Sequence, residues 1–408
     1  MAGFNKNKII NDPVYGFLTI PTETVYDVIQ HPYFQRLRRI RQLGLSELVY
    51  PGATHTRFHH ALGALNLMIR AVDTLKRKGV EITDEETEAV YLGILLHDIG
   101  HGPFSHTLEH VIVKGVHHEQ ISELMMHRIN REMDGKLSLA IDIFKQKYTH
   151  KPFLGQLISG QLDMDRLDYL QRDSFYTGVS EGIVGTERII NMLNVCDGQL
   201  VVEAKGIYSV EKFLIARRLM YWQVYLHKTA IAADELLFAV LQRARDLAGQ
   251  GTPLGNYFPL VHFMGREISA KDLDDESLDL YAMLDDNDIL NALKVWMGHE
   301  DPVLSTLSGF MLNRRLPKII ISKTAFTAVQ IQEYQQQVMK TLQIQDIENM
   351  SYYVRTGVLE NHAYKSEGGG IPILSREGKV QDMAEVTDNY NLDALKDTVT
   401  KYYLTYLR

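Results

Sequence analysis

The chain of 408 residues has little that could cross-link it or hold it in a membrane. Its single cysteine, Cys196, excludes an intramolecular disulfide and is typical of proteins from a reducing compartment. No run of about 18 apolar residues occurs, and the first residues, MAGFNKNKII, lack the apolar core of a signal peptide. We therefore expect a cytoplasmic protein that does not contact membranes.

Positive charge is not in excess either. The 43 lysines and arginines are outnumbered by 51 aspartates and glutamates, which gives a formal net charge of -8. Bulk attraction to nucleic acid is therefore not expected. A local basic pocket is still possible, because four arginines are close together in sequence: Arg36, Arg38, Arg39 and Arg41. Internal repeats and low-complexity tracts are also absent, so the chain reads as an ordinary globular protein.

Helical periodicity dominates the first 250 residues. Thr83 and Glu86 form a capping-box pattern that predicts a helix start, and Gly178 predicts a helix end. We expect helices over residues 31–43, 57–79, 83–97, from about 118, and over 162–173. The sequence predicts a helical catalytic core over residues 1–250.

The pattern changes after about residue 190. Asp197-Gly198 predicts a hairpin turn, and a long helical stretch is expected over residues 210–247. Later segments alternate short helices with candidate strands, namely LPKIIIS, SYYVRTGVL and IPILSREGKV, and Gly368–Gly370 predicts a flexible loop. We therefore expect a mainly α fold with a smaller α+β region over residues 251–408, which could supply an interface or a regulatory element.

Histidine is concentrated in one window of the chain. Nine of the 16 histidines lie there: His55, His59, His60, His97, His101, His106, His110, His117 and His118. Within this window, Gly100, Gly102 and Pro103 end a helix directly after His97-Asp98, so that two adjacent side chains can reach one ion. With His60 and Asp165 from other helices, they form the ligand set that a hydrolytic divalent metal requires. We predict His60, His97, Asp98 and Asp165 as metal ligands.

The remaining histidines need other roles, because a catalytic metal site keeps a position open for water or substrate. We interpret His101, His106 and His118 as acid/base groups, since an ordinary imidazole titrates near pH 6.5. Glu109 and Glu119 could orient them. For His110, His117 and His127 we favour a solvated helix face.

Six ordered motifs carry a family resemblance: KIINDPVYG, FQRLRRIRQLG, YPGATHTRFHHALG, LLHDIGHGPFSH, HHEQIS and DRLDYLQRDSFYTG. Over roughly residues 8 to 230 the chain resembles the HD-domain metal-dependent phosphohydrolases, in the branch of the deoxynucleoside triphosphate triphosphohydrolases (dGTPase-like enzymes and the SAM-and-HD-domain dNTPase). The resemblance implies an HD-domain helical bundle that hydrolyses a dNTP to deoxynucleoside and inorganic triphosphate. The metal is implied to be divalent, and Mn, Fe, Mg, Ni and Zn all stay open.

The resemblance also implies roles for individual residues. His101 and His106 would flank the α-phosphate beside His118 and Glu119, with Glu109 tuning the acid. The residues implied to bind the triphosphate are Arg57, Arg166, Tyr169 and Arg217. Those implied to bind the deoxyribose are Gln42, Leu43, Asp173 and Tyr225, where Tyr225 forms a wall against C2′.

An activator-nucleotide site is implied by Lys8, Ile9, Gln35 and Arg38. The chain departs from the pattern at Gln30, which stands where the family has the acidic residue that reads guanine; this weakens the case for GTP as activator. Arg166 replaces the lysine of the vertebrate enzyme and keeps the charge but not the geometry. Because such activator sites lie between subunits, a homo-oligomer (a dimer or a tetramer) is also implied.

Two alternatives stay open. Another HD phosphohydrolase activity, on nucleoside monophosphates, cyclic nucleotides or guanosine polyphosphates, would use the same metal ligands. A catalytically silent nucleotide-binding regulator would keep the metal for structure alone.

Overall fold

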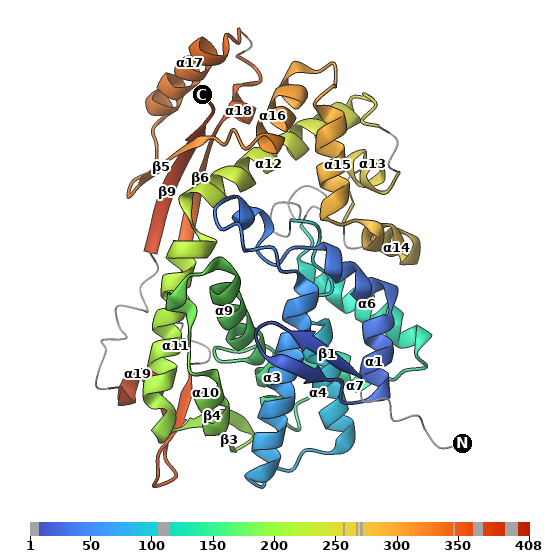
Figure 1. Cartoon of the computed structure of the whole chain (residues 1–408), viewed down its shortest axis with the longest axis vertical. Helices are drawn as coiled ribbons and strands as arrows, with labels where there is room; N and C mark the ends of the chain where they lie inside the picture. The colour runs from blue at the N-terminus through green and yellow to red at the C-terminus, as the bar shows by residue number, and fades with distance from the viewer. Residues whose placement is uncertain are drawn as a thin grey trace.

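The computed structural model describes residues 8–104, 115–255, 258–266, 268–269, 272–345, 347–361, 370–387 and 399–408 (Figure 1). Helices predominate over these residues, and two of the three small β-sheets include strands of the C-terminal third. The predicted mainly α fold with a smaller α+β C-terminal region is thus confirmed. Among the described residues, no helix is both long and apolar enough to cross a membrane.

Three helices form the centre of the bundle: α3 (Arg57–Arg77), α4 (Asp84–Leu96) and α9 (Met164–Thr177), with α3 packed between the other two. The predicted capping box starts α4, since Glu86 donates its backbone N–H to Thr83 and its carboxylate accepts the N–H of Thr83. Gly178 ends α9 with a φ of 74°, a conformation that glycine adopts without strain. The predictions of these helices, and of α6 (His118–Glu132), are confirmed.

The helix predicted over residues 31–43 is wrong beyond Gln35. The chain forms a short α2 (Pro32–Gln35), a 3-10 turn η1 (Arg36–Arg39) and, further on, a 3-10 turn η2 (Gly44–Leu48). Between these turns the backbone is extended at Ile40, and Arg41 pairs with Thr56. The apolar spacing indicated a helix, but pairing with the segment before α3 requires an extended backbone.

The other helices surround this centre and build the C-terminal third. They are α1 (Glu23–Gln30), α7 (Ser138–Phe144), α8 (Pro152–Ile158), η3 (Ser180–Gly182), α10 (Thr186–Met192), η4 (Ala204–Gly206), α11 (Ile207–Met220), the π-helical turn η5 (Tyr221–Tyr225), α12 (Lys228–Gly249), α13 (Phe258–Met264), α14 (Asp275–Met283), α15 (Asp286–Trp296), α16 (Pro302–Leu312), α17 (Ala328–Leu342), α18 (Met350–Tyr353) and α19 (Met383–Val386). The helical stretch predicted over 210–247 is therefore interrupted by η5 and a short link before α12.

The strands form three small sheets. An antiparallel hairpin joins β1 (Ile9–Asp12) to β2 (Gly16–Thr19). A second sheet has the order β3 (Leu193–Cys196), β4 (Gln199–Glu203), β7 (Pro372–Leu374), β8 (Val380–Asp382), and a third has the order β5 (Lys318–Ser322), β9 (Val399–Tyr406), β6 (Val354–Asn361). The turn predicted at Asp197-Gly198 joins β3 to β4, and both residues have positive φ, 50° and 75°.

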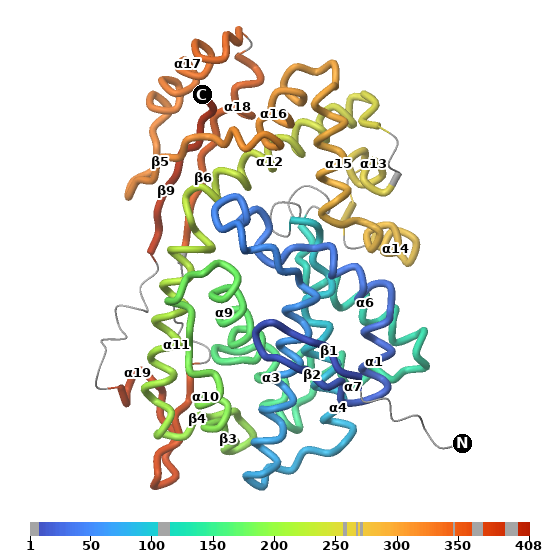
Figure 2. The backbone as a smooth tube through the Cα atoms, in the orientation of Figure 1, coloured from blue at the N-terminus to red at the C-terminus, as the bar shows by residue number. Residues whose placement is uncertain are grey.

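The two predicted regions share a hydrophobic core. One cluster of buried side chains extends from Leu18 to Leu407, and β4 of the first region pairs with β7 of the second. In Figure 2 the last sheet lies beside α12, while α11 lies beside α9. The division at residue 250 stays a prediction.

Candidate active site

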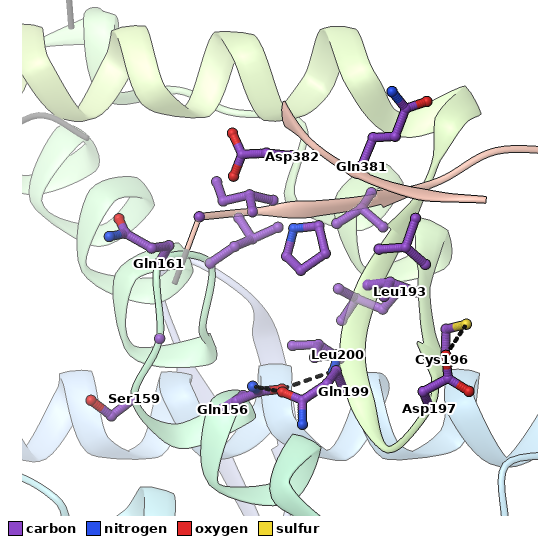
Figure 3. A pocket seen from close by; sticks show the side chains of 18 of the residues that line it. Gln156, Ser159, Gln161, Leu193, Cys196, Asp197, Gln199, Leu200, Gln381 and Asp382 are labelled. Carbon is purple, nitrogen blue, oxygen red and sulfur yellow. Dashed lines mark hydrogen bonds between the residues drawn. The ribbon is translucent and has the colours of Figure 1, made fainter. Parts of the chain in front are cut away.

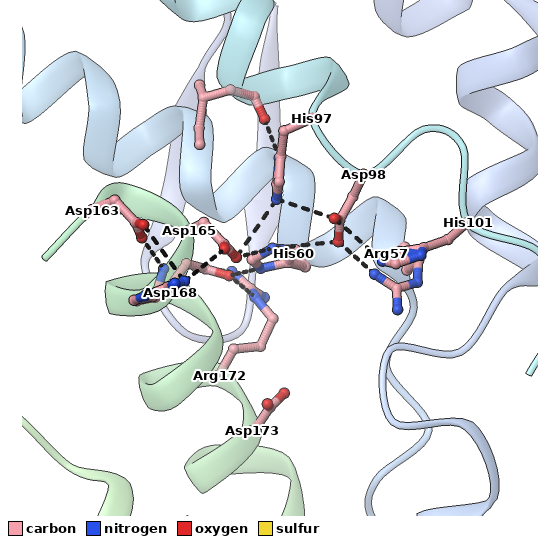
Figure 4. Close-up of polar contacts among 12 residues, drawn as sticks. Arg57, His60, His97, Asp98, His101, Asp163, Asp165, Asp168, Arg172 and Asp173 are labelled. Atoms are coloured by element: carbon pink, nitrogen blue, oxygen red, sulfur yellow. Dashed lines mark hydrogen bonds and ion pairs between the residues drawn. The ribbon is translucent and has the colours of Figure 1, made fainter. Parts of the chain in front are cut away.

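The four predicted metal ligands lie together where the start of α3, the end of α4 and the start of α9 meet (Figure 4). Nε2 of His60 lies 3.1 Å from Oδ1 of Asp165, and Nε2 of His97 lies 3.5 Å from the same oxygen. Nε2 of His97 also lies 3.4 Å from Oδ1 of Asp98. Ligands of one metal ion, each bonded at about 2.0–2.2 Å, have this mutual spacing.

The two ring nitrogens that point into the cluster suit a cation. Nε2 of His60 and Nε2 of His97 are buried without hydrogen-bond geometry to any described partner. The other ring nitrogens are engaged: Nδ1 of His60 lies 2.8 Å from Oδ2 of Asp168, and Nδ1 of His97 lies 2.6 Å from the carbonyl oxygen of Ile94. Both partners are acceptors, so in the neutral imidazole Nδ1 carries the proton and Nε2 has the lone pair that a cation needs. The residues present therefore fit a divalent ion.

Without an ion, the carboxylates of the cluster favour positive charge on the His60 ring, so an ion that binds Nε2 takes the place of a proton. Burial alone would lower the pKa of His60, but the carboxylates of Asp165 and Asp168 outweigh it and raise that pKa to about 10. Burial alone would raise the pKa of Asp165, but His60 and His97 hold it well below its ordinary value. The carboxylate stays ionised, as a metal ligand must.

Asp98 lies between two groups of ligand atoms. One group is His60, His97 and Asp165, and the other joins Asp98 to His101 and His118; the atoms of each lie within 4.8 Å of one another. Asp98 also accepts a hydrogen bond from NH1 of Arg57. The resemblance implies that Arg57 binds the triphosphate, but here its guanidinium contacts a predicted metal ligand.

The turn after α4 is held by Arg36, which the sequence analysis had placed in a possible basic pocket, and by Ser122, to which it gave no role. Arg36 is fully buried and donates to the backbone carbonyls of Leu284 (2.9 Å), Ile99 (3.2 Å) and His101 (2.7 Å). Ser122 of α6 donates to the carbonyl of His97 and accepts from the N–H of Gly100, both at 2.9 Å. No local pattern marks these partners, because they lie far from the turn in sequence.

The predicted acid/base groups are brought together only in part. The rings of His101 and His118 lie 3.8 Å apart between centroids, and Nε2 of His101 lies 3.4 Å from Oδ1 of Asp98. Glu119 is largely exposed, and its Oε1 lies 3.7 Å from Nε2 of His118. His106 and Glu109 lie outside the described residues.

Three of the residues predicted to bind substrate have buried polar atoms that lack hydrogen-bond partners in the described part of the chain. Nε and NH1 of Arg217, Nε of Arg166 and Oε1 of Gln42 are buried without a hydrogen-bond partner among the described residues. Burial raises the pKa of Tyr169, and the positive charges of Arg217 and Arg166 oppose that rise. Buried donors without partners are costly unless a ligand satisfies them.

The predicted sugar-binding residues also meet. Asp173 is buried and accepts hydrogen bonds from the hydroxyl of Tyr225 (2.8 Å) and from Nε2 of His55 (2.7 Å). Tyr225 ends the π-helical turn η5, a distortion often found at functional sites. Leu43 is partly buried against the core. The sequence analysis gave His55 no role.

Of the residues predicted for an activator site, Ile9 and Arg38 are exposed, while Lys8 and Gln35 are half-buried. Gln35 accepts a hydrogen bond from Nε of Arg38 (2.9 Å), and the Arg38 guanidinium stacks on Phe58 at 3.6 Å from the ring centroid. Nζ of Lys8 lies 5.0 Å from the ring centroid of Tyr26, while Ile9 is 59% exposed.

A separate cavity of about 590 Å³ lies between the β3–β4–β7–β8 sheet and α8 (Figure 3). Glutamine amides and apolar side chains dominate its wall, and its described lining residues include no lysine or arginine. None of the predicted site residues lies there, and a triphosphate would find no cation.

Comparison with known proteins identifies an HD domain in this chain. Residues 57–173 match the HD domain and residues 184–250 the HD associated region. A phosphohydrolase of known structure from Bacteroides thetaiotaomicron is 52% identical, with a TM-score of 0.94 over 98% of this chain and 100% of that chain. The uncharacterized protein YwfO of Bacillus subtilis is 35% identical over 76% of this chain and 71% of its own length. The chain belongs to the HD-domain phosphohydrolase family.

More distant relatives of this phosphohydrolase carry a substrate in their names. The deoxynucleoside triphosphate triphosphohydrolase SAMHD1 homolog of Dictyostelium discoideum is 32% identical over 57% of this chain and 48% of its own length. Human deoxynucleoside triphosphate triphosphohydrolase SAMHD1 is 29% identical over 59% of this chain and 45% of its own length. The chain therefore spans about half the length of these two relatives.

Proposed function

We propose that this HD phosphohydrolase hydrolyses deoxynucleoside triphosphates to deoxynucleoside and inorganic triphosphate. The observation that carries the proposal is the face of α9. Asp165, Tyr169 and Asp173 follow one another at i, i+4 and i+8, and so share one side of the helix over roughly 12 Å. This face runs from the metal cluster, past Arg166 and Arg217, to the pair of Asp173 and Tyr225.

In the proposed reaction, His60, His97, Asp98 and Asp165 hold a divalent ion. When bound, the ion would polarise the α-phosphoryl group and lower the pKa of a water ligand. Arg166 and Arg217 neutralise the triphosphate, which carries about four negative charges. Asp173 accepts the 3′-hydroxyl, and the ring of Tyr225 lies against C2′, where a ribose hydroxyl would collide.

The proton transfers fall to the imidazoles beside Asp98. Water attacks the α-phosphorus, the bond from phosphorus to the 5′-oxygen breaks, and the water oxygen leaves with the triphosphate. The attacking water loses a proton and the departing 5′-oxygen gains one; we assign this transfer to His101 and His118, whose rings lie 3.8 Å apart.

The test is a product assay. The purified protein is incubated with each dNTP, singly and in pairs, with Mn²⁺ or Mg²⁺, and the products are separated. Deoxynucleoside together with intact triphosphate supports the proposal, and the same assay on ribonucleotides reports the role of Tyr225. Release of orthophosphate, or turnover only of monophosphates, cyclic nucleotides or guanosine polyphosphates, would replace it with another HD phosphohydrolase activity.

Asp98→Ala separates catalysis from regulation. Loss of turnover together with loss of biological function in this variant supports the enzyme. Undiminished biological function in the variant would instead support a silent nucleotide-binding regulator.

We also propose a homo-oligomer with an activator nucleotide near Lys8, Ile9, Gln35 and Arg38. Sedimentation with and without paired dNTPs tests it. Full activity from a protein that sediments as a monomer would contradict it.

A further inference from the structure

A buried chain of charged groups joins the N-terminal hairpin to the metal cluster. It begins at His60, whose Nδ1 lies 2.8 Å from Oδ2 of Asp168. Arg172 donates to both oxygens of Asp168, from Nε at 2.9 Å and from NH2 at 3.0 Å. All three side chains are fully buried. The carboxylate that orients His60 is therefore itself oriented by Arg172.

Arg172 is held in turn by the hairpin. Its NH1 donates to Oδ2 of Asp12 at 2.8 Å, and Asp12, at the end of β1, is 4% exposed. The other oxygen of Asp12 accepts the backbone N–H groups of Val14 and Tyr15, both at 2.9 Å. One carboxylate thus shapes the turn between β1 and β2 and also anchors Arg172.

Close packing of α3 against α9 fixes the positions of these charged groups. A Cβ at Gly63 of α3 would collide with NH2 of Arg172 and Oδ1 of Asp168, so the absence of a side chain there makes the close approach of α3 and α9 feasible. Removing one partner from a buried ion pair leaves a charge uncompensated, which typically costs about 3–5 kcal/mol. Separating any two of these groups is therefore costly.

We propose that Asp12 and Arg172 are positioning residues that couple the conformation of the β1–β2 hairpin to the orientation of the His60 imidazole at the metal. Coupling between two sites is reciprocal. Metal binding therefore stabilises the hairpin turn, and a change in the hairpin changes metal affinity. The inference rests on the proposed metal centre and is independent of the substrate.

Asp12→Asn tests the coupling in the full-length protein. The asparagine oxygen can still accept the N–H groups of Val14 and Tyr15, but its amide group places a donor against Arg172. Asp301→Asn is the matched control. Asp301 likewise accepts a backbone N–H, from Leu304 at 2.7 Å, and pairs with an arginine, Arg243 NH2 at 2.6 Å, in the C-terminal third.

Two readouts other than turnover are measured with Co²⁺: its dissociation constant with its visible absorption spectrum, and amide hydrogen exchange at Val14 and Tyr15. We expect Asp12→Asn to weaken Co²⁺ binding by about 10-fold or more and to alter the spectrum, the usual scale for groups that orient a metal ligand. We expect Asp301→Asn to change neither. In the wild-type protein, Co²⁺ should slow exchange at both amides.

Unchanged Co²⁺ affinity and spectrum in Asp12→Asn would overturn the coupling while leaving the metal centre intact. Equal losses in Asp12→Asn and Asp301→Asn would also overturn it, because they would reflect general destabilisation. A wild-type protein that binds no Co²⁺, Mn²⁺ or Mg²⁺ would overturn the metal centre, and the coupling with it.

Discussion

Nδ1 of His60 and Oδ2 of Asp168 lie 2.8 Å apart, and neither side chain is exposed to solvent. The contact fixes which imidazole nitrogen carries the proton, and so turns Nε2 toward His97 and Asp165 (Figure 4). Asp168 is not itself near enough to serve as a ligand of the proposed ion, since it engages the far side of the ring.

Asp168→Asn should weaken metal binding by about 10–100-fold, because the neutral amide no longer favours a protonated Nδ1. The variant should also unfold more readily without metal, since Arg172 loses a charged partner. Titration with Mn²⁺ against a competing chelator measures the affinity, and urea unfolding measures the stability. Metal affinity equal to the wild type would show that Asp168 does not orient His60.

Arg217→Leu tests the proposed triphosphate contact. Because Nε and NH1 of Arg217 have no partner among the described residues, their loss should leave the fold intact. A hydrogen bond to a charged group contributes about 1.5–3 kcal/mol, so kcat/KM for a dNTP should fall about 10- to 150-fold. Arg218→Leu is the control, as the next residue on α11 points about 100° away. Equal losses in both variants would contradict a specific contact.

The helices that carry the site could be predicted because their signals are local. The capping box of Thr83 and Glu86, the glycines after His97, and Gly178 each act within one turn of a helix. The ligand set was predicted by combining the histidine-rich window with Asp165 of a later helix, and the structure brings His60, His97 and Asp165 together. Asp168 could also have been predicted to lie near the metal ligands, since it follows Asp165 at i+3 on the same face of α9.

The supports of the site could not be predicted, because they join residues far apart in sequence. Asp286 of α15 accepts the backbone N–H groups of Arg41 and Phe104, both at 2.9 Å, and Tyr281 of α14 donates to the carbonyl of Gly100 at 3.0 Å. Nothing local distinguishes such an aspartate from a solvated one. The C-terminal third thus holds the turn beside the metal cluster, a role that composition alone does not indicate.

Glu86 provides a prediction about pH. Its carboxylate accepts from Nζ of Lys151 (2.7 Å), the N–H of Thr83 (2.8 Å) and the hydroxyl of Tyr148 (2.8 Å). Burial alone would raise its pKa, but these three donors outweigh burial and lower it. Since the folded pKa lies below the unfolded one, the stabilisation is present above the unfolded pKa, about 4.3, and is lost as the pH falls through the folded value.

Glu86→Gln should therefore lower the free energy of unfolding by about 1–3 kcal/mol at pH 7, and the difference from wild type should shrink as the pH falls below about 4. Urea unfolding at a series of pH values measures this. Glu85→Gln, on the exposed side of the same turn, should change stability by less than about 0.5 kcal/mol. A deficit for Glu86→Gln that stays constant with pH would rule out the charge as its cause.

Gly100→Ala should disrupt the turn that presents His97 and Asp98. A Cβ at Gly100 would collide with the backbone oxygen of His118 and the backbone nitrogen of Ser122, neither of which can move without shifting α6. We expect a loss of about 1–3 kcal/mol in unfolding free energy, as for other overpacked sites, and a larger proportional loss of turnover, since His118 would shift relative to Asp98. Gly309→Ala is the matched control, because Gly309 lies within α16 with open space at its Cβ position and should gain about 0.5–1 kcal/mol from helix propensity. If both substitutions were stabilising, the close contact between the turn and α6 could not be what fixes His118 beside the proposed metal centre.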